Sequence, residues 1–330
     1  MTATKQRIIY LGTPQFAVKP VFALLRAGYQ IPLVITQPPR PQGRKGQVTA
    51  TPVQRFAEDA RLPFLAVPNV NQPEVLAQIA AAKPDLLVVA AFGQLLSEEL
   101  LQLAPFGAVN IHTSLLPEYR GAAPVQRALM DGRNKTGVTL MRIVKALDAG
   151  DIIDQAECVI SSTDNTGSLR EDLMAVGTDL LLHNLPQLFA GRLKPTPQDE
   201  ALATYAAKIT PADELLDWRR TAGELYNQLR GLLPETSAYT WYKDGENWQR
   251  LKIWQMRVAE ACGNAAAPGT VFGVDADGLL VAAGEGTLHL QLLQPAGKGR
   301  MEAAAWLRGR RDLQKSGLRF AEPEQEAGNE

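Results

Sequence analysis

The stretch DLLVVAA at Asp85–Ala91 decides the fold class of this chain. After its first residue every position is apolar, so both faces of a strand built from it are apolar. A strand buried on both faces is typical of the centre of a parallel sheet with helices on each side. The stretch therefore predicts an α/β domain.

Strand-like and helix-like segments alternate on either side of this stretch. Strands are expected at residues 7–11, 31–36, 64–67, 107–112, 136–144 and 151–159, and helices at 16–25, 52–60, 73–82, 125–130 and 166–189. This alternation predicts a Rossmann-like open sheet. The first loop, Gly12-Thr13-Pro14, lacks the glycine pattern that cradles a dinucleotide, so a nicotinamide cofactor is disfavoured.

The second half of the chain has a different pattern of expected elements. A short helix is expected at 221–231, followed by short strands at 249–256, 269–274, 278–282 and 287–293 with glycine turns between them. Closely spaced short strands predict a small OB-like β-barrel, with His289 on its exposed face. We therefore expect a catalytic domain at 1–190, a linker at 191–208, a barrel at 209–315 and an acidic tail at 316–330, which should be dispensable.

A polar pair ends the strand expected at 107–112. Asn110 and His112 are two positions apart, so both side chains point to one face of that strand. The carboxyl end of a strand in an open α/β sheet borders a ligand crevice. A lone histidine at a strand end is more often structural, but the acidic loop Asp148–Asp151 follows the next strand. The combination indicates a hydrogen-bond donor, a base and an orienting carboxylate around one reacting carbon.

Phe92 follows the central strand at the same predicted edge of the sheet. Two interpretations are open for it. Its ring is either a wall for a planar ligand or an ordinary part of the hydrophobic core.

Charge is distributed unevenly along a chain whose net charge is −1. Before Glu58 there is no acidic side chain, while eight lysines and arginines give that segment a formal +8. A proline- and glycine-rich loop at 37–47, in which no regular structure is expected, carries Arg40, Arg44 and Lys45. The loop is interpreted either as a finger that meets phosphate groups or as a solvated connection.

Composition limits the class of protein. With 45 % hydrophobic residues in 330, the chain can bury substantial cores. Cys158 and Cys262 form no C-x-x-C, and the three histidines are dispersed, so neither a disulfide framework nor a metal site is expected. The strand-like run near the N-terminus is too short for a secretory or membrane-spanning segment, so we expect neither there. We expect a cytoplasmic protein without a membrane partner, and a monomer.

Four motifs together resemble the folate-dependent formyltransferases. They are Asn110-x-His112, the run Ser114-Leu115-Leu116-Pro117, the run RGAAP at 120–124 with Gln126-Arg127, and Asp148-Ala149-Gly150-Asp151. The basic loop at 40–45, the TYAAKI run at 204–209 and the QPAGKGRM run at 294–301 are similar to the branch of that family that acts on methionyl-tRNA. The resemblance covers nearly the whole chain.

The resemblance implies an enzyme that transfers the formyl group of 10-formyltetrahydrofolate to the α-amine of methionyl-initiator tRNA. Asn110 and His112 would donate to the developing oxyanion, and Asp148 would orient His112 and stabilise its charged form. The folate site would include Ser114, Leu115, Leu116 and Pro117, with Phe92 as a further candidate. The tRNA site would include Arg44, then Lys45, Arg40 and Lys208, together with the barrel.

Two other functions are compatible with these residues. A formyltransferase acting on a small amine, such as a purine-pathway nucleotide or an amino sugar nucleotide, would keep the catalytic trio without needing the basic loop or the barrel. A tRNA-binding protein that has lost catalysis would need the loop and barrel alone, and the intact trio argues against it.

Overall fold

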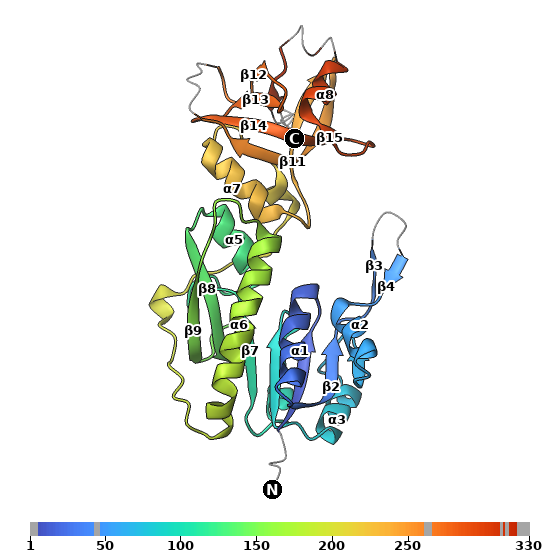
Figure 1. Ribbon diagram of the computed structural model, residues 1–330, viewed down its shortest axis with the longest axis vertical. Coiled ribbons are helices and arrows are strands. Elements are labelled where there is room, and N and C mark those ends of the chain that lie inside the picture. Colours follow the sequence, from blue (N-terminus) through green and yellow to red (C-terminus); the bar gives the residue numbers. More distant parts are fainter. Residues whose placement is uncertain (1–5, 43–46, 261–265, 311–312, 314–316, 322–330) are drawn as a thin grey trace, which may run out of the picture. The chain divides into compact units, whose positions relative to one another are not determined.

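The chain divides into two units, and each is described by itself (Figure 1). The structure is a computed structural model that describes residues 6–42, 47–260, 266–310, 313 and 317–321. Unit 1 combines residues 1–125, 135–160 and 168–208. Unit 2 combines residues 126–134, 161–167 and 209–330.

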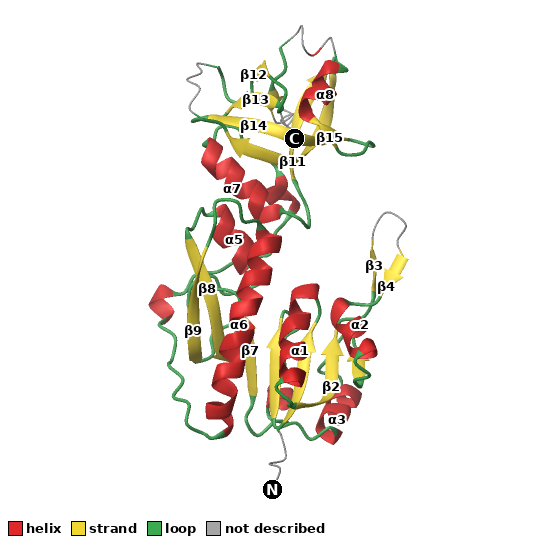
Figure 2. Cartoon of the chain, viewed as in Figure 1, coloured by secondary structure: helices red, strands yellow, loops and turns green. Residues whose placement is uncertain are grey.

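A seven-stranded sheet organises unit 1, in the order β5-β2-β1-β6-β7-β8-β9 (Figure 2). The first five strands in this order are parallel, and β8 and β9 are antiparallel to their neighbours. All five residues of β6 are buried, which confirms the central parallel strand expected at 85–91. The strands are β1 (Arg7–Gly12), β2 (Gln30–Thr36), β5 (Phe64–Ala66), β6 (Leu86–Ala90), β7 (Ala108–His112), β8 (Lys135–Arg142) and β9 (Ile152–Val159).

Two helices of unit 1, α2 and α4, begin at a residue whose side chain caps the helix. At α2, the Thr51 hydroxyl accepts the backbone N–H of Gln54, and Pro52 occupies the first turn, where its missing N–H costs nothing. The four-residue helix α4 was not expected, because one turn is too short to show a helical period. The helices are η1 (Gln15–Ala17), α1 (Val18–Arg26), α2 (Pro52–Asp59), α3 (Pro73–Ala81), α4 (Glu98–Leu101) and α6 (Thr166–Phe189).

Helix α6 packs closely against β7 and β8, and this contact decides which face of the sheet is free for a site. A Cβ on Gly177 would lie 2.5 Å from Ile111 Cγ2 and 2.9 Å from Val138 Cγ1, so only glycine allows this approach. Ile111 therefore points toward the helix. Because side chains alternate along a strand, Asn110 and His112 point to the opposite face.

Residues 191–208, expected to be a linker, make hydrogen bonds within unit 1. Thr196 forms an antiparallel bridge with Ile152, and Tyr205 forms a parallel bridge with Arg120. A short helix, η2 (Glu200–Leu202), lies between these bridges. The segment therefore belongs to unit 1, where it contacts β9 and the loop that follows β7.

The proline-rich loop contains regular structure that was not expected. Strands β3 (Arg40–Gln42) and β4 (Gln47–Thr49) pair as an antiparallel hairpin. A two-stranded ribbon tolerates Pro41 because the residue needs no ladder partner on its outer edge. The expectation of an irregular loop was wrong for these strands, and residues 43–46 lie outside the described part of the chain.

An antiparallel sheet organises unit 2, in the order β12-β13-β14-β11-β10-β16, with β15 paired to β14. Helix α5 runs from unit 1 into unit 2, and α7 starts with a capping box formed by Thr221 and Glu224. The elements are α5 (Pro124–Met130), η3 (Pro211–Glu214), α7 (Ala222–Leu232), β10 (Ala238–Asp244), β11 (Asn247–Val258), β12 (Val271–Val274), β13 (Leu279–Ala282), β14 (Thr287–Pro295), β15 (Met301–Glu302), α8 (Ala303–Arg308) and β16 (Phe320–Ala321).

The chain around β16 closes this sheet into a barrel. Phe320 N–H donates to the Gly269 carbonyl at 2.8 Å, and Val271 N–H donates to the Leu318 carbonyl at 2.9 Å. Because β16 also pairs with β10, the two edges of the sheet are joined, and the predicted barrel is confirmed. Gly269, at φ +84°, allows the contact, since a Cβ there would lie 2.1 Å from the Phe320 carbonyl oxygen.

Two expectations for this half need correction. Residues 317–321 were assigned to the acidic tail, but Leu318 and Phe320 are buried in the barrel core. His289 was expected on the exposed face and is instead buried, with Nε2 2.9 Å from an Asp275 carboxylate oxygen. The turn that contains Asp275 covers it, because Gly278 lies against the Leu290 carbonyl.

Candidate active site

His112 ends β7 as a buried side chain with two distinct ring nitrogens. Its Nε2 lies 3.1 Å from the Tyr119 carbonyl oxygen. Because a carbonyl only accepts, Nε2 must carry the hydrogen of this bond. Its Nδ1 lies 3.7 Å from Asp148 Oδ2, so a protonated ring forms an ion pair with that carboxylate. Nδ1 is therefore the ring atom that can hold or release a proton at this site.

Asn110 lies on the same face of β7 and is partly exposed. Among the described residues its side-chain amide has no hydrogen-bond partner, so its two N–H groups are available to a ligand. The structure thus brings an amide donor and an imidazole to one strand end, as expected from the sequence.

Asp148 reaches His112 because the 143–151 loop folds back over the sheet. The Asp148 carboxylate accepts the backbone N–H of Gly121 at 2.8 Å, which joins this loop to the one that follows β7. Gly150 allows the loop to fold, since a Cβ there would lie 2.0 Å from the Arg142 carbonyl oxygen. Asp148 itself has φ +50°, a left-handed conformation that a non-glycine residue adopts at a cost.

A second polar network holds the Asp148 loop from outside. The Gln198 side-chain amide donates to the Asp148 and Gly150 carbonyls at 2.8 and 2.7 Å, and its oxygen accepts from Arg120. The Arg120 side chain, only 2 % exposed, also binds Glu200 through two nitrogens, which lowers the pKa of Glu200. Sequence reasoning missed Gln198 and Glu200, because they lie about 50 positions away in a segment without periodicity.

The loop at 114–117 is held by Thr139 of β8 and Gln155 of β9. The Thr139 hydroxyl donates to the Ser114 carbonyl at 2.7 Å and accepts the Leu116 N–H at 3.0 Å. The Gln155 amide donates to the Leu116 carbonyl at 2.9 Å and to Thr139 at 2.8 Å. The loop also contains a cis peptide bond before Pro117. Thr139 and Gln155 were not predicted, although Thr139 pairs directly with His112 in the sheet.

Comparison with known proteins identifies the family of this chain. Residues 6–185 match the Formyl transferase family, and residues 208–311 match the family described as Formyl transferase, C-terminal domain. The chain is 46 % identical to a methionyl-tRNA formyltransferase of Bacillus subtilis over 304 residues, which cover 92 % of this chain and 94 % of that protein. The chain belongs to the methionyl-tRNA formyltransferases. It is also 43 % identical to such a protein of Symbiobacterium thermophilum, over 96 % of each chain.

The fold of this formyltransferase is also that of a solved sugar N-formyltransferase. The structure of WlaRD, a sugar 3N-formyl transferase determined in the presence of dTDP and 5-N-formyl-THF, matches with a TM-score of 0.63 and 20 % identity. The match covers 90 % of this chain and 99 % of that one. At this identity the likeness concerns the fold alone.

The residues expected at the folate site of this formyltransferase differ in exposure. Leu115 is partly buried over Gly137, where a Cβ would clash with it at 2.4 Å, whereas the Leu116 side chain is almost fully buried. Phe92 is 2 % exposed and packs with Ile9 and Leu11 in the core of unit 1. Its ring therefore supports the core, which was one of the two interpretations left open.

The residues expected to meet tRNA are placed in part. Arg40 is exposed on β3 and donates to the Gln37 side-chain oxygen at 3.2 Å, and Lys208 is exposed at the end of unit 1. Arg44 and Lys45 lie outside the described residues. Within the described ranges, no cluster of three or more His, Cys, Asp or Glu side chains is suited to a metal ion, and no helix is long and apolar enough to cross a membrane.

Proposed function

We propose that this enzyme transfers the formyl group of 10-formyltetrahydrofolate to the α-amine of methionine esterified to initiator tRNA. The observation that carries the proposal is that Asn110 and His112 share one face of β7, with the Asp148 carboxylate beside His112, in a chain of this family. The formyl donor is a second substrate, and we propose that the loop at 114–117 binds it. The barrel at 209–315 is proposed to contact the tRNA, together with Arg44, Lys45, Arg40 and Lys208. We also propose that the enzyme acts as a cytoplasmic monomer.

The reaction needs a stabilised oxyanion and a proton transfer. As the amine nitrogen bonds to the formyl carbon, the formyl oxygen gains negative charge, which the free N–H groups of Asn110 can stabilise. The amine then loses a proton, and His112 Nδ1 is placed to hold it beside Asp148. When the bond from the formyl carbon to N10 breaks, that nitrogen leaves with one proton. The products are a formamide and tetrahydrofolate, so atoms and charge balance.

The deciding experiment is a formyl-transfer assay on methionyl-initiator tRNA and, in parallel, on a panel of small amines. Product on the tRNA alone is the expected result. Product on a small amine alone would keep the chemistry and replace the acceptor. His112→Ala should lower kcat about 100-fold or more. Asp148→Asn retains an oxygen to accept the Gly121 N–H and should lower kcat without lowering the Tm. Full activity in both variants would refute the assignment.

The basic loop has a separate test. Arg44→Ala should raise the KM for charged tRNA about 10-fold and leave the KM for folate unchanged, because it removes a contact to phosphate only. Arg26→Ala, a charge change on α1, serves as the matched control. Equal effects on both KM values would assign the loop another role.

A further inference from the structure

The outer face of the β10–β11 hairpin in unit 2 carries aromatic and basic side chains almost exclusively. On β10, Tyr239, Trp241 and Lys243 alternate with buried residues. On β11, Trp248, Arg250, Lys252 and Trp254 alternate with Leu251 and Ile253, which are fully buried. Since alternate residues of a strand share a face, these seven side chains form one surface, which we call the aromatic–basic face.

The register of the two strands interleaves the rings and the charges. Tyr239 pairs with Lys252, Trp241 with Arg250, and Lys243 with Trp248. The Arg250 guanidinium lies 4.6 Å from the Tyr239 ring centroid, and the Lys243 ammonium lies 5.5 Å from that of Trp248. Each of these cross-strand pairs therefore combines one aromatic ring with one cation.

A further cation extends the face beyond the hairpin. Arg300, exposed between β14 and β15, places its guanidinium carbon 3.4 Å from the Trp254 ring centroid. The Trp254 N–H donates to the Gln294 side chain at 2.9 Å, which holds the indole in place. Trp248 and Trp254 are six positions apart on β11, a span of about 20 Å. This length accommodates several nucleotides of one strand.

The charge of this face is available to a ligand. Within the described ranges, none of Lys243, Arg250, Lys252 and Arg300 forms an ion pair with a carboxylate. Arg257, on the same strand, is paired with Asp277 at 3.9 Å. Because β11 carries no acidic residue, a polyanion meets little repulsion along it.

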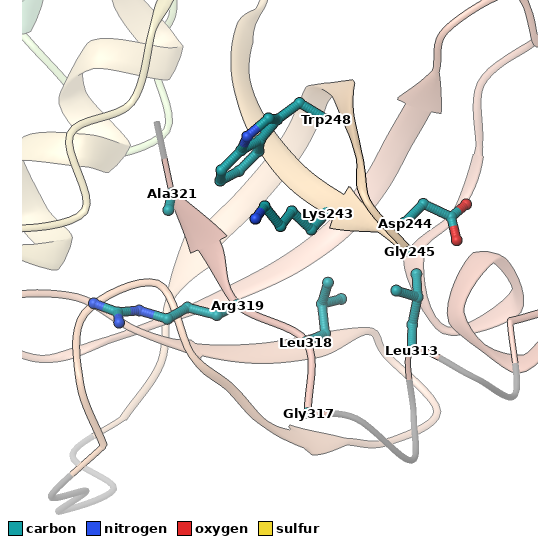
Figure 3. A pocket seen from close by; sticks show the side chains of 9 residues that line it. All are labelled: Lys243, Asp244, Gly245, Trp248, Leu313, Gly317, Leu318, Arg319 and Ala321. Atoms are coloured by element: carbon teal, nitrogen blue, oxygen red, sulfur yellow. The ribbon is translucent and has the colours of Figure 1, made fainter. Parts of the chain in front are cut away.

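A pocket of about 490 Å³ lies at the hairpin end of the face (Figure 3). Figure 3 shows the Lys243 side chain below the Trp248 indole, with Leu318 and Arg319 below both, and Asp244 also lines the pocket. The Trp248 ring suits a nucleobase, and the Lys243 and Arg319 cations suit its phosphate. The volume lies within the range of pockets that hold small ligands.

We propose that the aromatic–basic face binds an RNA strand, with phosphates at Arg250, Lys252 and Arg300 and an unpaired base against Trp248. Surfaces that bind single-stranded nucleic acid combine a basic track with aromatic rings for stacking, which is the composition found here. An acidic peptide would use the cations but would leave four aromatic rings without a function. The proposal rests on the tRNA substrate of the proposed function, and it identifies the side of the barrel that meets that substrate.

The test compares tRNA binding by the full-length enzyme with and without this face. Arg250→Gln with Lys252→Gln should weaken tRNA binding about 10-fold or more and reduce the slope of log K against log salt by about 1 for each charge removed. Arg257→Gln removes one paired cation from the same strand and should change neither quantity. Trp248→Ala should weaken binding about 10-fold, and Trp248→Phe, which keeps a ring, should restore most of it.

Three outcomes overturn the inference. Wild-type affinity and salt slope in the double variant would show that the face does not meet RNA. Equal losses in Arg257→Gln would show a general charge effect. Binding of a polyglutamate peptide that the double variant abolishes, with tRNA binding unchanged, would indicate a protein partner. The formyl-transfer assay on wild-type enzyme is read separately, so an enzyme that binds tRNA through this face without formylating it would refute only the proposed function.

Discussion

The side-chain amide of Gln198 donates a hydrogen bond to the main-chain carbonyl of Asp148 at 2.8 Å. The same amide holds the Gly150 carbonyl, and Arg120 fixes its oxygen. Asp148 faces His112 from a left-handed backbone conformation, which these hydrogen bonds to its loop help to hold. Gln198 is therefore a positioning residue, although it contacts no reacting atom.

Replacing Gln198 with Glu tests this role, because a carboxylate cannot donate to the two carbonyls. We expect kcat to fall roughly 10- to 100-fold through misplacement of Asp148, with little change in the KM for folate. Steady-state kinetics and a thermal melt on the same preparation are the measurements. Gln187→Glu alters another glutamine that accepts from an arginine, and should leave kcat unchanged. A loss of Tm with normal kcat would assign Gln198 a purely structural role.

Thr139→Val should damage the 114–117 loop more than the fold. It removes the hydroxyl that binds the Ser114 carbonyl and the Leu116 N–H, leaving both buried groups without that partner. We expect a loss of about 1–3 kcal/mol in the free energy of unfolding and a raised KM for the formyl donor. Thr178→Val is the matched control, since that hydroxyl bonds only its own helix. Equal KM values in the two variants would contradict a role in the folate site.

The Arg127–Asp213 pair should make unit 2 sensitive to acid. The hydrogen bond from Arg127, at 2.6 Å, lowers the pKa of Asp213. A carboxylate with a lowered folded-state pKa contributes stability above its unfolded pKa of about 3.9, and this contribution is lost as the pH falls through the folded value. Arg127→Met should therefore lose about 1–3 kcal/mol at pH 7, with a smaller difference from wild type below about pH 4.

Urea unfolding between pH 7 and pH 3 measures this difference. Lys135→Met breaks an exposed pair with Glu157 and should change stability by less than about 1 kcal/mol at every pH. A difference between wild type and Arg127→Met that stays constant down to pH 3 would show that the pair has no part in acid sensitivity.

The closing strand of the barrel predicts a sharp limit for truncation. Phe320 is 1 % exposed and stacks on Trp218 with ring centroids 5.4 Å apart. Phe320→Ala should cost about 3–5 kcal/mol, and removal of residues 317–330 should unfold or loosen the barrel. Removal of 322–330 alone should be neutral, since that run has no large apolar side chain. Thermal melts of the two truncations decide the matter, and equal stability would refute a role for β16 in closing the barrel.

Local pattern in the sequence was sufficient for the strands of the large sheet in unit 1 and for part of the candidate site. The apolar run at 85–91 predicted the central strand because a strand buried on both faces has apolar residues at consecutive positions. The spacing of Asn110 and His112 predicted a shared face because strand side chains repeat every two residues. The motifs around them also predicted the family, which the match at 46 % identity confirms.

Other features depended on contacts between distant segments. His289 is paired with Asp275, which lies in a turn 14 positions away. Residues 317–321 belong to the barrel because Leu318 and Phe320 form hydrogen bonds with Val271 and Gly269. A short polar segment without periodicity gave no sign that Gln198 holds Asp148. Sequence alone thus predicted the strands of the large sheet, the family and Asn110, His112 and Asp148 as candidate catalytic residues, because these follow from local period and motif. Only the tertiary structure decided which residues support the trio and which face of the barrel is basic, because hydrogen-bond partners and cross-strand neighbours are set by folding.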